Sequence, residues 1–250
     1  MRRLALTLLA ALALRGCVAY EYEQEFWIHV DGSGTVNVTG RAELWTAFKG
    51  VAVPAGEDAA REAARRLFED SGLRVRRVTV TSRGGRSYLF VSADFDDVNR
   101  LSGTAAFPDL RLALHPDGDR LRLEGTWSPP PAARGAPAGD GQMAVRFHLP
   151  SKVYEHRNAM DGVERGNIVG WRQDVRTALA GGGLEVGALI DRRSILVSTI
   201  GLFATAIVLA VSMLAGLILW VRRRGARTTA AAGLRRESPP PPAPSDPRES

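Results

Sequence analysis

The stretch Tyr20-Glu21-Tyr22-Glu23-Gln24-Glu25-Phe26 alternates glutamates with mainly aromatic residues, a pattern typical of a β-strand with one buried face. The next residues with a clear local preference are Asp31-Gly32-Ser33-Gly34, which favour a tight turn. Alternation then resumes at Thr35-Val36-Asn37-Val38-Thr39 and continues toward Leu44-Trp45. The pattern predicts a long β-hairpin over residues 20–46.

Residues Glu57 to Ser71 follow a helical period instead. Glu57 and Arg61 stand four residues apart and favour a helix, as do Glu62 and Arg66. Gly72 suits the position just after a helix. Five apolar residues repeat along one face of this predicted amphipathic helix: Ala60, Ala63, Ala64, Leu67 and Phe68.

The remaining pattern up to residue 191 predicts strands joined by turns. Leucine and arginine alternate over 110–114 and 121–125. These predicted strands therefore have one solvent-exposed face, as in an antiparallel sheet. No alternation of strands with helices is present to suggest a parallel sheet. The predicted class is therefore α+β, with a mainly antiparallel sheet and one amphipathic helix packed on it. The other predicted strands cover 73–80, 87–91, 143–149, 152–156, 167–171 and 184–189, and residues 128–142 predict a surface loop.

A single C-terminal transmembrane helix is predicted from Ile195 to Val221. These 27 residues contain no charged side chain, and about 20 apolar residues suffice to cross a bilayer. Arg222, Arg223 and Arg224 follow at once, and basic flanks stay on the cytoplasmic side. We expect the N-terminal domain outside the cytoplasm and a disordered cytoplasmic tail over residues 225–250.

The first 17 residues have the form of an export signal. A basic start is followed by an apolar run over 4–14 that is too short to span a bilayer. Leu14-Arg15-Gly16-Cys17 resembles a bacterial lipobox, although Arg15 stands where a small or apolar residue is usual. The resemblance implies cleavage before Cys17 and acylation of this residue. Cleavage after Ala19 and a retained, uncleaved anchor are the alternatives.

Cys17 is the chain's only cysteine, so an intramolecular disulfide and a cysteine-based zinc site are both excluded. Lipidation is the best explanation for a lone cysteine at the end of an export signal. A small residue that closes the apolar run is the alternative, and it would leave a free thiol.

The net charge of +6 comes from the two ends of the chain and indicates membrane topology. The first 17 residues hold three arginines, and the segment after Val221 holds seven arginines and three acids. Removing them from 33 basic and 27 acidic residues leaves 23 and 24, which is close to neutral. The exported region therefore lacks the basic surplus of a nucleic-acid-binding protein.

The sequence contains no local motif of an enzyme, cofactor or metal site. The four histidines lack the spacing of a zinc protease helix, and Asp94, Asp96 and Asp97 lack the glycine and glutamate of a calcium loop. Motifs for nucleotide phosphates and for a nucleophilic serine are also missing. We expect a protein that is not an enzyme and needs no cofactor. A hydrolase with a dispersed site that uses His148 or His156 is the remaining enzymatic alternative.

Aromatic residues are the strongest binding candidates. Core packing is their default role. The functional alternative is a cleft for an acyl chain or a glycolipid. The candidates for lining such a cleft are Trp27, Trp45, Phe90, Trp127, Phe147 and Trp171.

Several of these features together resemble the LppM family of bacterial membrane-anchored lipoproteins. The resemblance rests on Cys17, on Asp31-Gly32-Ser33-Gly34, on Phe147-His148-Leu149-Pro150 with Val153, on Gly166-Asn167-Ile168-Val169-Gly170-Trp171, and on the span closed by arginines. It implies an exported α+β domain over residues 18–191 with similarity to lipid-binding modules, and a span over 192–224. It supplies no catalytic residues.

Two non-enzymatic functions follow as hypotheses. The first is a membrane-tethered module that binds an envelope lipid or glycolipid, so its partners are the bilayer and an acyl ligand. The second is a protein-interaction or accessory module of an envelope complex. A deep apolar cavity with an open mouth would favour the first hypothesis, and a filled core would favour the second.

Overall fold

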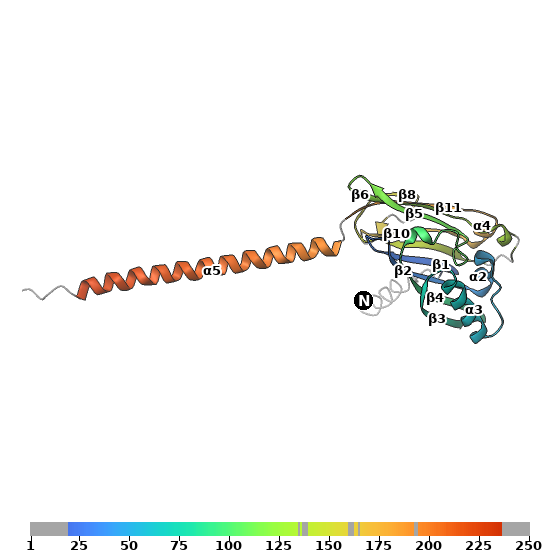
Figure 1. Cartoon of the computed structure of the whole chain (residues 1–250), viewed down its shortest axis with the longest axis horizontal. Helices are drawn as coiled ribbons and strands as arrows, with labels where there is room; N and C mark the ends of the chain where they lie inside the picture. The colour runs from blue at the N-terminus through green and yellow to red at the C-terminus, as the bar shows by residue number, and fades with distance from the viewer. Residues whose placement is uncertain are drawn as a thin grey trace, which may run out of the picture. The chain divides into compact units, whose positions relative to one another are not determined.

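The computed structural model describes residues 20–134, 136, 140–159, 163–164, 166–192 and 195–236 (Figure 1). The chain divides into two units, Met1–Ile195 and Leu196–Ser250. The predicted signal peptide and Cys17 lie outside the described residues. So do residues 237–250 of the predicted tail.

The first unit contains a seven-stranded sheet and a four-stranded sheet. The seven-stranded sheet has the order β3-β4-β2-β1-β7-β10-β9, and the four-stranded sheet has the order β5-β6-β11-β8. The strands of the first sheet are β1 Tyr22–Ile28, β2 Gly34–Arg41, β3 Arg74–Arg83, β4 Arg86–Phe95, β7 Gln142–His148, β9 Val163–Glu164 and β10 Ile168–Asp174. Those of the second are β5 Leu110–Asp117, β6 Arg120–Trp127, β8 Val153–Arg157 and β11 Leu184–Asp191.

Among the described strands, every pairing is antiparallel except that of β1 with β7. The predicted α+β class with mainly antiparallel pairing is confirmed. Two segments far apart in sequence form the parallel pair, with Phe26 opposite Phe147. A local sequence pattern does not show which distant segment a strand pairs with, because such a pairing depends on closing a long loop.

The predicted hairpin is correct in its turn and wrong in its end. β1 and β2 alternate buried and half-buried residues, and Gly32 takes a φ of 85° in the turn. After Arg41, however, the chain forms helix α2, Ala42–Lys49. Leu44, Trp45, Ala47 and Phe48 are buried there, a spacing that fits one face of a helix better than a strand.

The predicted amphipathic helix is confirmed as α3, Glu57–Glu69. It buries Ala60, Ala64 and Phe68, and both predicted i,i+4 ion pairs form. The described residues also contain a short α4, Val175–Leu179, and two 3-10 turns, η1 Val98–Arg100 and η2 Pro131–Ala133.

One hydrophobic core joins the two sheets and the helices. The seven-stranded sheet contributes Phe26 and Phe147, whose rings stack at 5.1 Å between centroids. Phe68 of α3 meets Trp45 of α2 and Phe107, which precedes β5. Phe48 of α2 meets Trp127 at the end of β6. Interlocking rings therefore fill the space between the layers.

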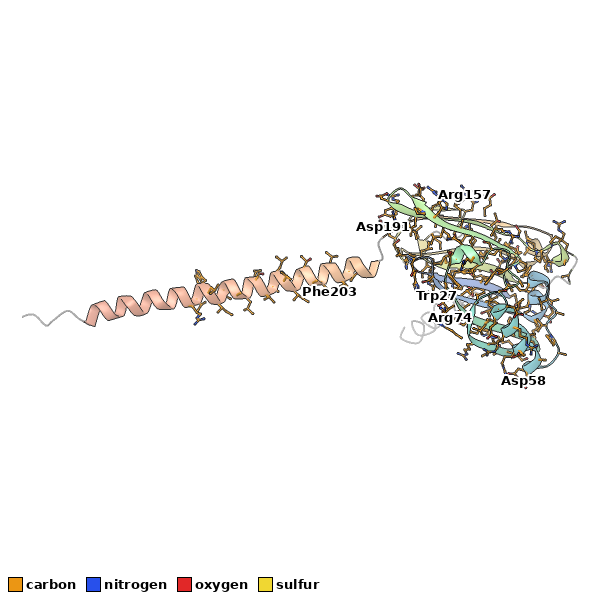
Figure 2. The ribbon with its side chains drawn as sticks, in the orientation of Figure 1. Trp27, Asp58, Arg74, Arg157, Asp191 and Phe203 are labelled. Carbon is orange, nitrogen blue, oxygen red and sulfur yellow. The ribbon has the colours of Figure 1, made fainter. Side chains whose placement is uncertain are left out.

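Helix α5 begins at Ile195, the last residue of the first unit, and its other residues up to Arg236 belong to the second unit (Figure 1). Within it, Thr199–Arg222 is long and apolar enough to cross a membrane, with a mean hydropathy of 2.6. Its side chains are exposed, as Phe203 illustrates (Figure 2). The helix takes in residues 225–236, which the sequence analysis assigns to a disordered tail. Alanine and arginine, both strong helix formers, dominate this extension.

Candidate functional site

A groove of about 450 Å³ lies beside the two helices of the first unit. It runs between the start of α2, the loop over 51–56, the first turns of α3 and the β3–β4 hairpin. We call it the α2–α3 groove. Its apolar lining is Val53, Pro54, Ala55, Ala60, Val80 and Leu89, and its polar lining includes Glu43, Glu57, Thr81, Ser82, Ser87 and Tyr88.

Small side chains of α3 leave this space open. A narrow apolar crevice adjoins the groove and shares Val53, Ala60 and Leu89 with it. Ala63 and Ala64 also line the crevice, and Trp45 and Leu67 complete its walls. The crevice has a volume of only about 10 Å³, so the space open to a ligand is that of the groove.

Trp45, which belongs to the packed core, has a buried indole donor. Its side chain is 2% exposed, and Nε1 is buried with no hydrogen-bond partner among the described residues. A buried donor without an acceptor costs about 1–3 kcal/mol.

The polar rim of the groove is partly fixed by hydrogen bonds. The Tyr88 hydroxyl donates to Glu21 Oε2 at 2.7 Å. Burial, together with the hydrogen bond and charge of Glu21, raises the pKa of Tyr88, so the phenol stays protonated at neutral pH. Glu43 and Glu57 add two carboxylates to the lining. This rim is therefore unfavourable for an anionic group.

The structure does not gather the six predicted aromatic candidates around one ligand space. Trp45 lines the narrow crevice beside the α2–α3 groove and is also part of the packed core. Trp127, Phe147 and Trp171 lie in the packed core. Trp27 and Phe90 are half-buried on the face of the seven-stranded sheet that points away from the core.

Trp27 has a specific partner on that outer face. Its ring stacks on His148 at 4.5 Å between centroids. His148 Nε2 lies 2.6 Å from Glu25 Oε1, and Arg146 Nη1 lies 3.7 Å from the same oxygen. Figure 2 labels Trp27 on this sheet and Arg157 on the four-stranded sheet. The strand register of β1 and β7 explains the stack, because Trp27 is paired with His148.

The two histidines of the enzymatic alternative are far from equivalent. His148 pairs with a carboxylate, whereas His156 is exposed on β8. Among the described residues, no group of three or more His, Cys, Asp or Glu side chains is placed to hold a metal ion.

A second depression, of about 340 Å³, lies on the outer face of the four-stranded sheet above Gly187. It is lined by charges of both signs, Arg122 and Arg157 with Glu124 and Glu155. This mixture makes it a poorer place for an apolar chain than the α2–α3 groove.

The loop over 51–56 is the part of the groove that the sequence analysis missed. Val51-Ala52-Val53-Pro54-Ala55 is an apolar run that contains a proline, which argues against a central strand. An apolar loop just before a helix was the available signal. Val51 of this loop is 37% exposed, so the run is not buried as a core strand would be.

The sequence matches no protein-family model. It also matches no curated protein. Among solved structures, the chain is similar to the NMR structure of the folded domain of Mycobacterium tuberculosis LppM, with a TM-score of 0.38 and 14% identity. The alignment covers 71% of this chain and 94% of that domain. This is a distant likeness in fold alone.

Proposed function

We propose that the protein is a non-catalytic, membrane-anchored module that binds the acyl chain of an envelope lipid in the α2–α3 groove. The observation that carries the proposal is the groove of about 450 Å³, which has both an apolar and a polar lining. An acyl chain would cover its apolar side chains, and the hydroxyl groups of Thr81, Ser82 and Ser87 are donors for the ester or amide oxygen of a lipid. Grooves of this size are common for small ligands.

The short connection to α5 supports a lipid as the occupant. β11 ends at Asp191 and α5 begins at Ile195, so three residues separate them. Three extended residues span only about 10 Å. If α5 crosses a bilayer, the domain is held within reach of lipids at the surface from which α5 emerges.

We further propose that the domain lies outside the cytoplasm and that Arg222, Arg223 and Arg224 remain inside, following the positive-inside rule. Acylation of Cys17 would add a second membrane anchor at the other end of the domain. Two anchors give firmer attachment than one acyl chain alone.

Filling the groove tests the proposal. Ala60→Leu adds bulk where the crevice and the groove meet, whereas Ala113→Leu makes the same change at an exposed position of β5. The probe is the uncharged methyl ester of cis-parinaric acid, titrated by fluorescence into the full chain in detergent micelles, with the signal of protein-free micelles subtracted. We expect Ala60→Leu to weaken binding at least tenfold and Ala113→Leu to leave it unchanged. Equal binding by all three proteins, or no binding by the unaltered chain, would refute lipid binding in this groove.

The second candidate remains a protein-interaction or accessory module of an envelope complex. The packed core favours it, because the rings of Phe26, Phe147, Trp127 and Phe48 fill the space that a ligand between the sheets would need. It predicts that Ala60→Leu leaves probe binding unchanged while altering which envelope proteins co-purify with the full chain.

A further inference from the structure

The core contains a charged pair that the proposed function does not use. Lys49 is the last residue of α2, and Asp109 lies just before β5. Lys49 Nζ is 3.0 Å from Asp109 Oδ1 and 3.4 Å from Oδ2. Both side chains are 0% exposed. The amine therefore faces the carboxyl group without water between them.

The two oxygens of Asp109 have different surroundings. Oδ2 accepts hydrogen bonds from Trp127 Nε1 at 2.9 Å and from Gln24 Nε2 at 2.5 Å. Oδ1 faces Lys49 Nζ. Oδ2 is thus held by two neutral donors besides its longer contact with Lys49, and Oδ1 makes the shorter contact with the amine.

Aromatic rings complete the enclosure. Lys49 Nζ lies 4.4 Å from the centroid of the Phe107 ring and 6.0 Å from that of Tyr22. Burial lowers the pKa of Lys49, although the charge of Asp109 and its hydrogen bond act in the opposite direction. Taking both charges of such a pair out of water carries a large desolvation cost, and a neutral product avoids it.

We propose that Lys49 and Asp109 condense to form an intramolecular amide between Nζ and Cγ. The ammonium first passes one proton to Oδ1 across the 3.0 Å contact, which leaves a neutral amine and a carboxylic acid. The nitrogen lone pair then attacks Cγ and the N–C bond forms. The C–Oδ1 bond breaks, and Oδ1 departs as water with a second proton from nitrogen. No group is oxidised or reduced.

Trp127 and Gln24 have a defined part in this step. During the attack, negative charge develops on Oδ2, where both of their N–H groups already point. Donors fixed in advance at a developing oxyanion lower the barrier of acyl transfer. After condensation Oδ2 is the amide carbonyl oxygen and keeps both hydrogen bonds.

The cross-link would serve a domain that has no disulfide. Cys17 is the only cysteine, so a disulfide within the chain is excluded. An amide between residues 49 and 109 would join helix α2 to the start of the four-stranded sheet. Like a disulfide, it would restrict the unfolded chain, here between positions 60 residues apart.

Peptide mapping of the full chain, purified in detergent and digested with trypsin after denaturation, tests this proposal. An acylated Lys49 resists trypsin, so we expect residues 42–61 to be joined to residues 101–111, with a mass lower by one water than the two peptides together. Free peptides 42–49, 50–61 and 101–111, with no joined product, would overturn the proposal. Cleavage after Lys152, the chain's other lysine, is the internal control.

Two variants sharpen the readout. Asp109→Asn can condense with loss of ammonia instead of water, so its joined peptide should have the same mass as that of the unaltered chain. Lys49→Met has no amine and should give peptides 42–61 and 101–111 unjoined. A joined peptide in Lys49→Met would show that another residue forms the bond and would refute the assignment to Lys49.

Discussion

Glu23 shows how a single carboxylate on a sheet face couples stability to pH. It lies on the outer face of β1, where its Oε1 is buried without a hydrogen-bond partner among the described residues. Arg146 Nη1 is 3.6 Å from this oxygen. Burial nevertheless raises the pKa of Glu23, assisted by Glu25 and opposed by Arg146 and His148.

This raised pKa predicts a fall in stability with rising pH. An unfolded glutamate titrates near pH 4.3, so between that pH and the higher native pKa the folded state binds more protons than the unfolded state. The free energy of unfolding should therefore decrease as the pH rises through this window and stay lower above it. Glu23→Gln should remove this part of the decrease. Urea unfolding of the full chain in detergent, repeated from about pH 4 to pH 7, measures the slope.

Glu185→Gln is the matched control, because Glu185 is 64% exposed on β11. It should leave the pH dependence unchanged. If Glu23→Gln shows the same slope as the unaltered chain, burial of Glu23 is not the cause.

At the scale of elements, the β1–β2 hairpin depends on Gly34. Gly34 is paired with Ile28, and a Cβ added at this position would lie 2.0 Å from the Trp27 carbonyl oxygen and 2.7 Å from Phe95 Cζ. The close approach of the two strands leaves no room for even a methyl group. The sequence identifies Gly34 as a turn residue, but only the packing of Phe95 shows why the position excludes a side chain.

We predict that Gly34→Ala destabilises the domain by about 1–3 kcal/mol, as overpacking of a well-packed site does. Gly170→Ala is the control within the same sheet, because the nearest atom to its added Cβ is 3.9 Å away. Thermal unfolding of both variants, followed by circular dichroism, should show a lower midpoint for Gly34→Ala only. A similar midpoint for both variants would contradict the steric account.

Helix α2 is the element whose type the sequence analysis predicted wrongly. The alternation of apolar and polar residues over 35–39 predicts a strand that continues toward Trp45. Leu44, Trp45, Ala47 and Phe48, however, follow a helical spacing. The difference matters for function, since the start of α2 lines the groove with Ala42 and Glu43 and its last residue is Lys49 of the buried pair.

At the scale of the whole molecule, the proposed topology predicts which positions a membrane-impermeant reagent can reach. Ser82 is exposed near the tip of the β3–β4 hairpin, and Ser245 lies beyond α5 in the sequence. A membrane-impermeant maleimide applied to spheroplasts should label Ser82→Cys at once and Ser245→Cys only after lysis. The opposite order of labelling would place the domain in the cytoplasm and exclude the proposed topology.

The same measurement reports on Cys17. An acylated thiol cannot react with the maleimide, so the unaltered chain should remain unlabelled even after denaturation. Labelling of the unaltered chain would show a free thiol, and the proposed second anchor would then be absent.

The sequence alone determined the features that depend on local periodicity and composition. Alternation predicted the strands, helical spacing predicted α3, and a long uncharged run predicted a helix able to cross a membrane, because each pattern is repeated over neighbouring residues. Only the tertiary structure decided the two-sheet arrangement, the parallel pairing of β1 with β7, and the position of Trp27 and Phe90 on the outer sheet face, away from the buried aromatic candidates. It also decided that Lys49 meets Asp109, 60 positions away. Such contacts are set by how the layers pack, and no pattern confined to one segment records them.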